Sequence, residues 1–207
     1  MVIIMKVCVF GAASNLIDEK FIKATEMLCT KIAKNGHELV FGAGASGLMG
    51  AAARSFKAQG AKVTGIIPAY FKTETVEEIF EDCDELIFTE DMRERKKMME
   101  DAADAFVVVP GGIGTLEELF EIITLKQLAR HKKPIAFYNF NNFYDGLIDF
   151  LDKCEKEKFI REGCRNLYIA TDNDEELINY IEDDTPLELG LNDLKKKRGC
   201  KKTAPIV

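Results

Sequence analysis

Apolar residues along this chain alternate between short unbroken runs and longer stretches with helical spacing. The short runs are rich in β-branched and aromatic residues, which is typical of buried parallel strands. The longer stretches place an apolar residue every three or four positions, which is typical of helices that cover a sheet. Strands are expected over residues 2–10, 38–41, 61–67, 85–88, 106–109, 134–138 and 167–170, and helices over residues 16–34, 48–59, 90–103, 115–130, 143–155 and 174–182.

Strand and helix alternate throughout the 207 residues, with no internal repeat and no linker. This order predicts an α/β fold, a Rossmann-like, doubly wound domain whose mainly parallel sheet has about seven strands. The single nucleotide-binding domain is expected to span residues 1–185, and residues 186–207 are expected to form a basic, mobile tail. In such folds ligands bind at the carboxyl ends of the strands.

The most informative stretch begins with the buried strand over residues 106–109, which leads into a glycine-rich turn and then a helix. Pro110 ends the strand because it has no N–H to donate, and Thr115 is expected to cap the helix. The free N–H groups of the first helical turn and the helix dipole favour a bound phosphate. Packing of the turn is the alternative explanation of its glycines. These glycines are Gly111, Gly112 and Gly114.

Glu118 has two interpretations. Thr115 and Glu118 have the spacing of a capping box, in which the glutamate side chain accepts a hydrogen bond from the threonine N–H. A carboxylate one turn inside a helix that binds phosphate at its start is also well placed to act on a sugar. Spacing alone leaves capping and catalysis equally open. Glu121 lies three residues further along and faces the same way.

Two further turns follow expected strands, at residues 12–15 and 42–50. Residues 42–47 match the pattern G-x-G-x-x-G. A dinucleotide fold places an acidic residue about 20 positions further on to hold the ribose, whereas the next acid after Gly47 is Glu74. A nicotinamide dinucleotide is therefore not expected. All three turns leave carboxyl ends of strands, so they are expected to converge on one ligand.

The expected helix over residues 90–103 carries two cations on an apolar face. Met92, Arg95, Lys96 and Met99 share this face because they are spaced three and four residues apart. Buried cations are costly without partners. They therefore require an anion, either protein carboxylates or a ligand. A surface pair that reaches the solvent is the alternative.

Charge and composition exclude several classes of partner. The chain has 35 acidic and 28 basic residues, and six of the basic ones gather between residues 195 and 202. The rest of the chain is therefore strongly acidic and a poor surface for nucleic acid. No apolar run is long enough to span a bilayer, so no membrane association is expected.

Cysteine and histidine usage argues against metal and redox chemistry. None of the six cysteines forms a C-x-x-C pair, and only two histidines are present. Reduced thiols, a cytoplasmic location and no metal site are therefore expected.

Two motifs together resemble those of a known family. The segment from Met92 to Lys96 reads M-R-E-R-K, and the segment from Pro110 to Glu118 reads P-G-G-I-G-T-L-E-E. They are similar to the paired signature M-x-E-R-K and P-G-G-x-G-T-x-x-E of the LOG (Lonely Guy) family. These are cytokinin riboside 5′-monophosphate phosphoribohydrolases, often labelled lysine decarboxylase-like. A pyridoxal-dependent decarboxylase needs a Schiff-base lysine, and no stretch here argues for one.

The resemblance implies hydrolysis of the N-glycosidic bond of a nucleoside 5′-monophosphate, with AMP or an N6-substituted AMP as substrate. It implies Arg95 and Glu118 as the catalytic pair, no cofactor, and a homodimer with sites close to the subunit interface. A non-catalytic carrier or sensor of a nucleotide or a molybdopterin-type cofactor is the alternative on the same fold. The residues expected to bind substrate are Gly111, Gly112, Gly114, Thr115, Lys96, Glu121, Ser14, Gly44 and Met92.

Three alanines depart from the family pattern. Ala43 stands where a third consecutive glycine is usual, and its Cβ is expected to narrow the pocket. Ala12 and Ala13 replace polar or glycine residues of the first turn and remove hydrogen bonds to base or ribose. These changes leave the reaction class intact and leave the choice of base open.

Overall fold

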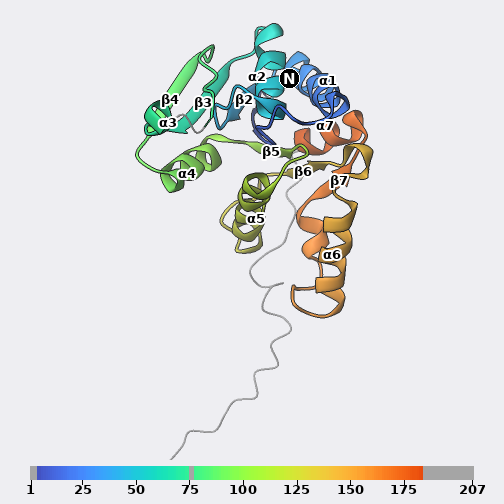
Figure 1. The fold of residues 1–207 in the computed structure, drawn as a ribbon. Helices are drawn as coiled ribbons and strands as arrows, with labels where there is room; N and C mark the ends of the chain where they lie inside the picture. The colour runs from blue at the N-terminus through green and yellow to red at the C-terminus, as the bar shows by residue number, and fades with distance from the viewer. Residues whose placement is uncertain (1–3, 75–76, 184–207) are drawn as a thin grey trace, which may run out of the picture.

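The computed structural model describes residues 4–74 and 77–183, which form a parallel sheet covered by helices on both faces (Figure 1). The sheet has seven strands, and each strand pair is parallel. The predicted doubly wound α/β fold is therefore confirmed. The expected basic tail over residues 186–207 lies outside the described residues.

The observed elements follow the predicted order with shifted ends. The strands are β1 (Lys6–Phe10), β2 (Glu38–Phe41), β3 (Val63–Pro68), β4 (Glu85–Thr89), β5 (Ala105–Val108), β6 (Ile135–Tyr138) and β7 (Ile169–Thr171). The α-helices are α1 (Glu19–Lys34), α2 (Gly47–Ala58), α3 (Phe71–Glu74), α4 (Met92–Ala102), α5 (Ile113–Gln127), α6 (Asp145–Lys156) and α7 (Asp174–Glu182). The short helix α3 was not predicted, because four residues are too few to show a helical period.

The two faces of the sheet bury two separate apolar cores. Ala105 and Val107 of β5 pack with α1, α2 and α7, whereas Phe106 and Val108 pack with α4, α5 and α6. Side chains alternate between faces along a strand, so a strand covered on both sides must be apolar at every position. This accounts for the unbroken apolar run in the sequence.

The strand order β4-β3-β2-β1-β5-β6-β7 sets the position of the ligand crevice. The chain proceeds outward from β1 in one direction and then returns to place β5 on its other side. The connections after β1 and β5 therefore diverge, which is the topological switch point where such folds bind ligands. The turns that follow these two strands are in direct contact, since the Ala12 N–H donates to Pro110 O at 3.1 Å.

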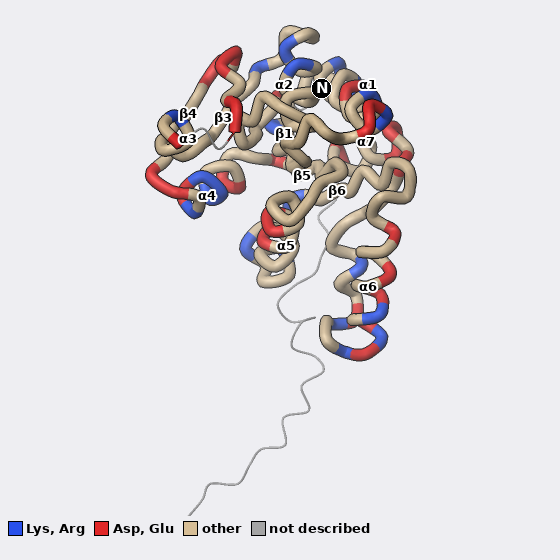
Figure 2. Tube along the Cα trace, viewed as in Figure 1, with Lys and Arg blue, Asp and Glu red and all other residues tan. Residues whose placement is uncertain are grey.

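Helices α4 and α5 lie on the same face of the sheet, beside this crevice (Figure 1). Figure 2 marks the basic positions on α4 and the acidic positions on α5, and ion pairs connect the two helices. Among the helices described, none is long and apolar enough to cross a membrane.

Candidate active site

A cavity of about 400 Å³ opens at the carboxyl ends of the central strands. This volume is within the range of small-molecule sites. The glycine turns after β1, β2 and β5 all contribute to its wall, as their order in the sequence predicted. The lining residues are Gly11, Ala12, Ala13, Ser14, Gly42, Gly44, Met49, Phe71, Glu77, Met92, Arg95, Gly112, Gly114, Thr115 and Glu118.

The turn after β5 presents unpaired N–H groups to this cavity. Helix α5 begins at Ile113 with Gly112 as its N-cap. The first intrahelical bond runs from the Leu116 N–H to Gly112 O at 2.9 Å. The N–H groups of Ile113, Gly114 and Thr115 precede it and have no intrahelical acceptor. Such a group of N–H donors at a helix start is suited to binding an anion.

The expected capping box is wrong. Because the helix begins two residues before Thr115, this threonine lies inside the first turn, where it is buried. The side chain of Glu118 contacts Arg95. The predicted interpretation of Glu118 as a helix cap is therefore excluded by the position of the helix start.

The three glycines of this turn serve different purposes. A Cβ on Gly111 would lie 2.1 Å from Thr115 Oγ1, so packing requires this glycine. A Cβ on Gly112 or Gly114 would meet no described atom within 4 Å. Both of these glycines line the cavity, whereas Gly111 does not. Packing therefore accounts for the first glycine, whereas it does not require the other two, which leave their part of the cavity wall without a side chain.

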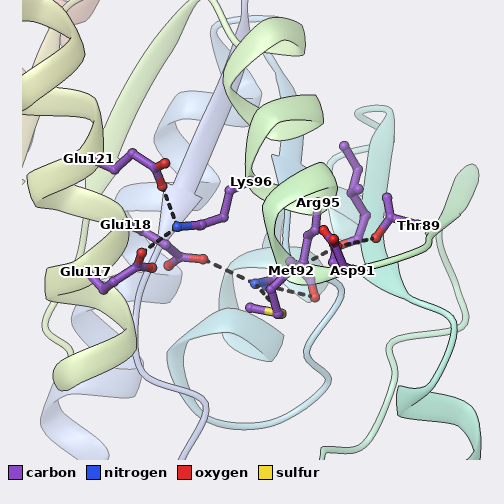
Figure 3. Close-up of polar contacts among 10 residues, drawn as sticks. Thr89, Asp91, Met92, Arg95, Lys96, Glu117, Glu118 and Glu121 are labelled. Atoms are coloured by element: carbon purple, nitrogen blue, oxygen red, sulfur yellow. Dashed lines mark hydrogen bonds and ion pairs between the residues drawn. The ribbon is translucent and has the colours of Figure 1, made fainter.

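Arg95 extends from α4 into the cavity and contacts three segments (Figure 3). Its Nε donates to Ile66 O at 3.1 Å and its Nη2 to Gly42 O at 3.3 Å. Its Nη1 donates to Glu118 Oε1, also at 3.3 Å. A Cβ on Gly42 would lie 1.7 Å from Nη2, so the glycine is required for the guanidinium to reach this place.

Glu118 is a buried carboxyl group whose charge is only partly compensated. Burial raises its pKa to about 7, and the nearby Arg95 guanidinium acts in the opposite direction. A group with this pKa is poised for proton transfer or charge stabilisation near neutral pH. The Arg95–Glu118 pair is therefore the part of the cavity most suited to chemistry.

Lys96 also finds its anion in the protein. It forms ion pairs with Glu117 and with Glu121, the latter at 2.6 Å (Figure 3). The two cations of the α4 face are thus paired with carboxylates of α5. Neither Lys96 nor Glu121 lines the cavity. The two side chains turn toward each other, and their predicted contact with substrate stays a prediction.

Of the residues predicted to bind substrate, six line the cavity and three do not. The three outside it are Gly111, Lys96 and Glu121, for the reasons given above. Those that line it are Ser14, Gly44, Met92, Gly112, Gly114 and Thr115, together with the predicted catalytic residues Arg95 and Glu118.

Glu77 is a lining residue that was not predicted. Its Oε1 is buried and finds no hydrogen-bond partner among the described residues, and burial raises the pKa of its carboxyl group. A Cβ on Gly44 would lie 2.1 Å from this oxygen. Glu77 belongs to no motif. Its only signal in the sequence is its place after β3, on the side where strand ends line the crevice.

The three alanines that depart from the family pattern lie in different surroundings. Ala12 and Ala13 line the cavity as expected. Ala43 does not: it is fully buried, and its Cβ packs toward Gly65 in the apolar core. The expectation that Ala43 narrows the pocket is therefore wrong. Ala43 has a φ of 59°, a left-handed conformation that favours glycine and turns its side chain away from the cavity.

Among the described residues, no group of three or more histidine, cysteine or acidic side chains is arranged to hold a metal ion. The five described cysteines are free thiols. The cavity offers backbone N–H groups, one guanidinium and two carboxyl groups, which suit an anionic organic ligand.

Comparison with known proteins identifies the family. The model of a family described as "Possible lysine decarboxylase" matches residues 49–181. A cytokinin riboside 5′-monophosphate phosphoribohydrolase of Arabidopsis thaliana, LOG7, is 36% identical over 182 residues, which cover 87% of this chain and 82% of that protein. The chain belongs to the LOG family.

A second LOG-family relative gives the same picture. The phosphoribohydrolase LOG of Oryza sativa subsp. japonica is also 36% identical, over 90% of this chain and 76% of its own.

Among solved structures, a molybdenum cofactor binding protein from Rippkaea orientalis has a TM-score of 0.66 and 20% identity, over 88% of this chain and 98% of that chain. At this identity the likeness concerns the fold.

Proposed function

We propose that this LOG-family protein hydrolyses the N-glycosidic bond of a nucleoside 5′-monophosphate, AMP or an N6-substituted AMP, to free base and ribose 5-phosphate. The observation that carries the proposal is the Arg95–Glu118 contact inside the cavity, one helical turn from the free N–H groups of α5. The names of the Arabidopsis and rice relatives support this reaction class.

The start of α5 suits the 5′-phosphate. Three N–H groups without intrahelical acceptors and the positive end of the helix dipole attract a dianion. Gly112 and Gly114 carry no side chain that would keep a phosphate away from the backbone. A phosphate held there leaves the ribose near Glu118, since this residue is one turn further along the same helix.

Glu118 and Arg95 suit the chemical step. Cleavage of the C1′–N bond develops positive charge on the ribose ring, a water oxygen bonds to C1′, and the base leaves with a proton. The Glu118 carboxylate stabilises this charge or orients the water. Arg95, fixed by Ile66 O and Gly42 O, keeps Glu118 in place and offers its remaining N–H groups to the base or the phosphate.

The test is an assay for base and ribose 5-phosphate released from AMP and from isopentenyl-AMP. Glu118→Gln is expected to bind nucleotide and to lose turnover by at least about 100-fold. Glu117→Gln is the matched control, because Glu117 pairs with Lys96 outside the cavity. Arg95→Ala is expected to impair turnover more than thermal stability. Wild-type rates in Glu118→Gln would contradict its catalytic role.

The alternative is a carrier or sensor on the same fold, a fold that this chain shares with a molybdenum cofactor binding protein. A carrier needs the glycine turn but not the Arg95–Glu118 pair. If the wild type released no base from either nucleotide while nucleotide still raised its melting temperature, the carrier function would replace the enzymatic one.

A further inference from the structure

A buried tyrosine contacts the backbone just before the glycine turn, and the proposed hydrolysis assigns it no role. Tyr144 precedes α6 and is 1% exposed. Its hydroxyl donates to Val109 O at 2.8 Å, and Val109 is the last residue before Pro110 and the glycines. Val109 is itself fully buried, so its carbonyl has to find its donor inside the protein.

Burial raises the pKa of this hydroxyl, and the backbone N–H of Gly111 acts in the opposite direction. The geometry of the peptide unit explains why. A trans peptide points its C=O and its N–H in opposite directions. The Ala12 N–H binds Pro110 O from one side at 3.1 Å. The Gly111 N–H of this peptide unit therefore points to the other side, where the Tyr144 oxygen lies.

Tyr144 is in turn firmly placed. Its ring packs on Phe137 of β6 with 5.5 Å between ring centroids, and its backbone N–H donates to Asn139 Oδ1 at 2.7 Å. Two successive peptide units of the turn are thus fixed to rigid parts of the fold, one through the turn after β1 and the other through Tyr144. The direction of the following N–H groups depends on both attachments.

We propose that Tyr144 is a positioning residue: its hydroxyl, bound to Val109 O, orients the turn so that the N–H groups from Ile113 to Thr115 converge on a phosphate. The inference rests on the proposed function for the identity of the ligand.

The test is Tyr144→Phe, which keeps the ring and removes the hydroxyl. The KM for AMP and the Kd for ribose 5-phosphate are both expected to rise about tenfold, the effect of one misplaced charge-assisted hydrogen bond. The Kd for adenosine, which has no phosphate, and kcat are expected to stay within about twofold.

Tyr168→Phe is the matched control. Tyr168 is also a buried tyrosine stacked on Phe137, with 4.5 Å between ring centroids. The Arg165 guanidinium carbon lies 4.9 Å from the centroid of the Tyr168 ring, and among the described residues no hydrogen bond joins Tyr168 to the glycine turn. A loss of stability common to both variants is thereby separated from a loss of phosphate affinity confined to Tyr144→Phe. Asn139→Ala, which removes the acceptor of the Tyr144 N–H, is expected to act in the same direction and more weakly.

Unchanged affinity for AMP and ribose 5-phosphate in Tyr144→Phe, with only a lower Tm, would overturn the proposal and leave the hydroxyl a purely structural group. If the wild type bound AMP without cleaving it, the proposed hydrolysis would fail while the affinities still tested Tyr144. If the wild type bound neither AMP nor ribose 5-phosphate, both proposals would fall.

Discussion

Packing does not require glycine at positions 112 and 114, and both residues line the cavity in which the proposed function places a phosphate. Gly114 is the second residue of α5, an ordinary helical position where alanine is the better helix former by up to about 1 kcal/mol. A protein selected for stability alone would place alanine there. The cavity that it lines supplies the reason for keeping glycine.

Gly114→Ala is therefore expected to raise thermal stability by a few degrees, about 2–4 °C, and to raise the KM for nucleotide at least tenfold. Gly146→Ala is the matched control, since Gly146 is the second residue of α6 and also meets no described atom within 4 Å. It is expected to raise the Tm with no change in KM. Equal KM values in both variants would contradict a phosphate at the start of α5.

At the scale of elements, α4 and α5 act as a pair. Helix α4 supplies the cations Arg95 and Lys96, and α5 supplies the carboxylates that receive them. The Arg95–Glu118 pair is largely shielded, with side chains 12% and 13% exposed. Lys96 is 14% exposed, but the side chain of its partner Glu121 is 38% exposed. The pairing joins two helices on one face of the sheet and brings the catalytic candidates together across the crevice.

The inner face of α5 carries one group that opposes stability. Thr115, Leu119, Ile122 and Lys126 are its buried residues. The Nζ atom of Lys126 has no hydrogen-bond partner in the described part of the chain, and burial lowers the pKa of this amine to about 8. Burial of this cation at neutral pH therefore lowers the free energy of unfolding.

Lys126→Met is expected to raise the free energy of unfolding at pH 7 by about 1–3 kcal/mol. The gain is expected to shrink above pH 8, because the folded wild type then holds the amine neutral while the unfolded chain still binds the proton. Urea unfolding at pH 7 and pH 9.5 measures both values. The exposed Lys132→Met is the control, and a Lys126→Met protein less stable than wild type would show that the amine has a favourable partner.

At the scale of the whole molecule, the pKa shift of Glu118 makes the free energy of unfolding depend on pH. The pKa of Glu118 is raised from 4.5 to about 7. A raised carboxyl pKa means that the folded state favours the protonated form. Its contribution to stability is complete below about pH 4.5 and is lost as the pH rises through 7.

The amide of the Glu118→Gln variant cannot ionise, so the variant does not share the loss of stability that the wild type shows as the pH rises. The free energy of unfolding of the variant minus that of the wild type is therefore expected to increase between pH 5 and pH 8, by up to about 3 kcal/mol. Denaturant unfolding of both proteins at the two pH values measures the change. A difference that is the same at both pH values would mean that Glu118 titrates normally in the fold. Activity of the wild type is expected to fall below pH 7 as the carboxylate is protonated.

We propose that the protein is a homodimer, as the family resemblance implies. Large apolar side chains remain exposed on and around α5 and α6, among them Ile113, Phe150 and Phe159, which are 89%, 59% and 84% exposed. Exposed apolar side chains that gather into one patch are typical of interaction surfaces. Light scattering is expected to give twice the chain mass of 23.2 kDa, and a single species at the chain mass would contradict the dimer.

The linear order of apolar runs and glycine turns was enough to determine the α/β class, the seven strands and the glycine turn that leads into α5, because these depend on local periodicity and backbone freedom. Arg95 and Glu118 were identified by motif. The helix start that removes Glu118 from its capping role, the ion pairs that withdraw Lys96 and Glu121 from the cavity, and the entry of Glu77 were decided by tertiary structure. Each depends on which side chains meet across elements far apart in sequence, and spacing along the chain carries no record of those distances.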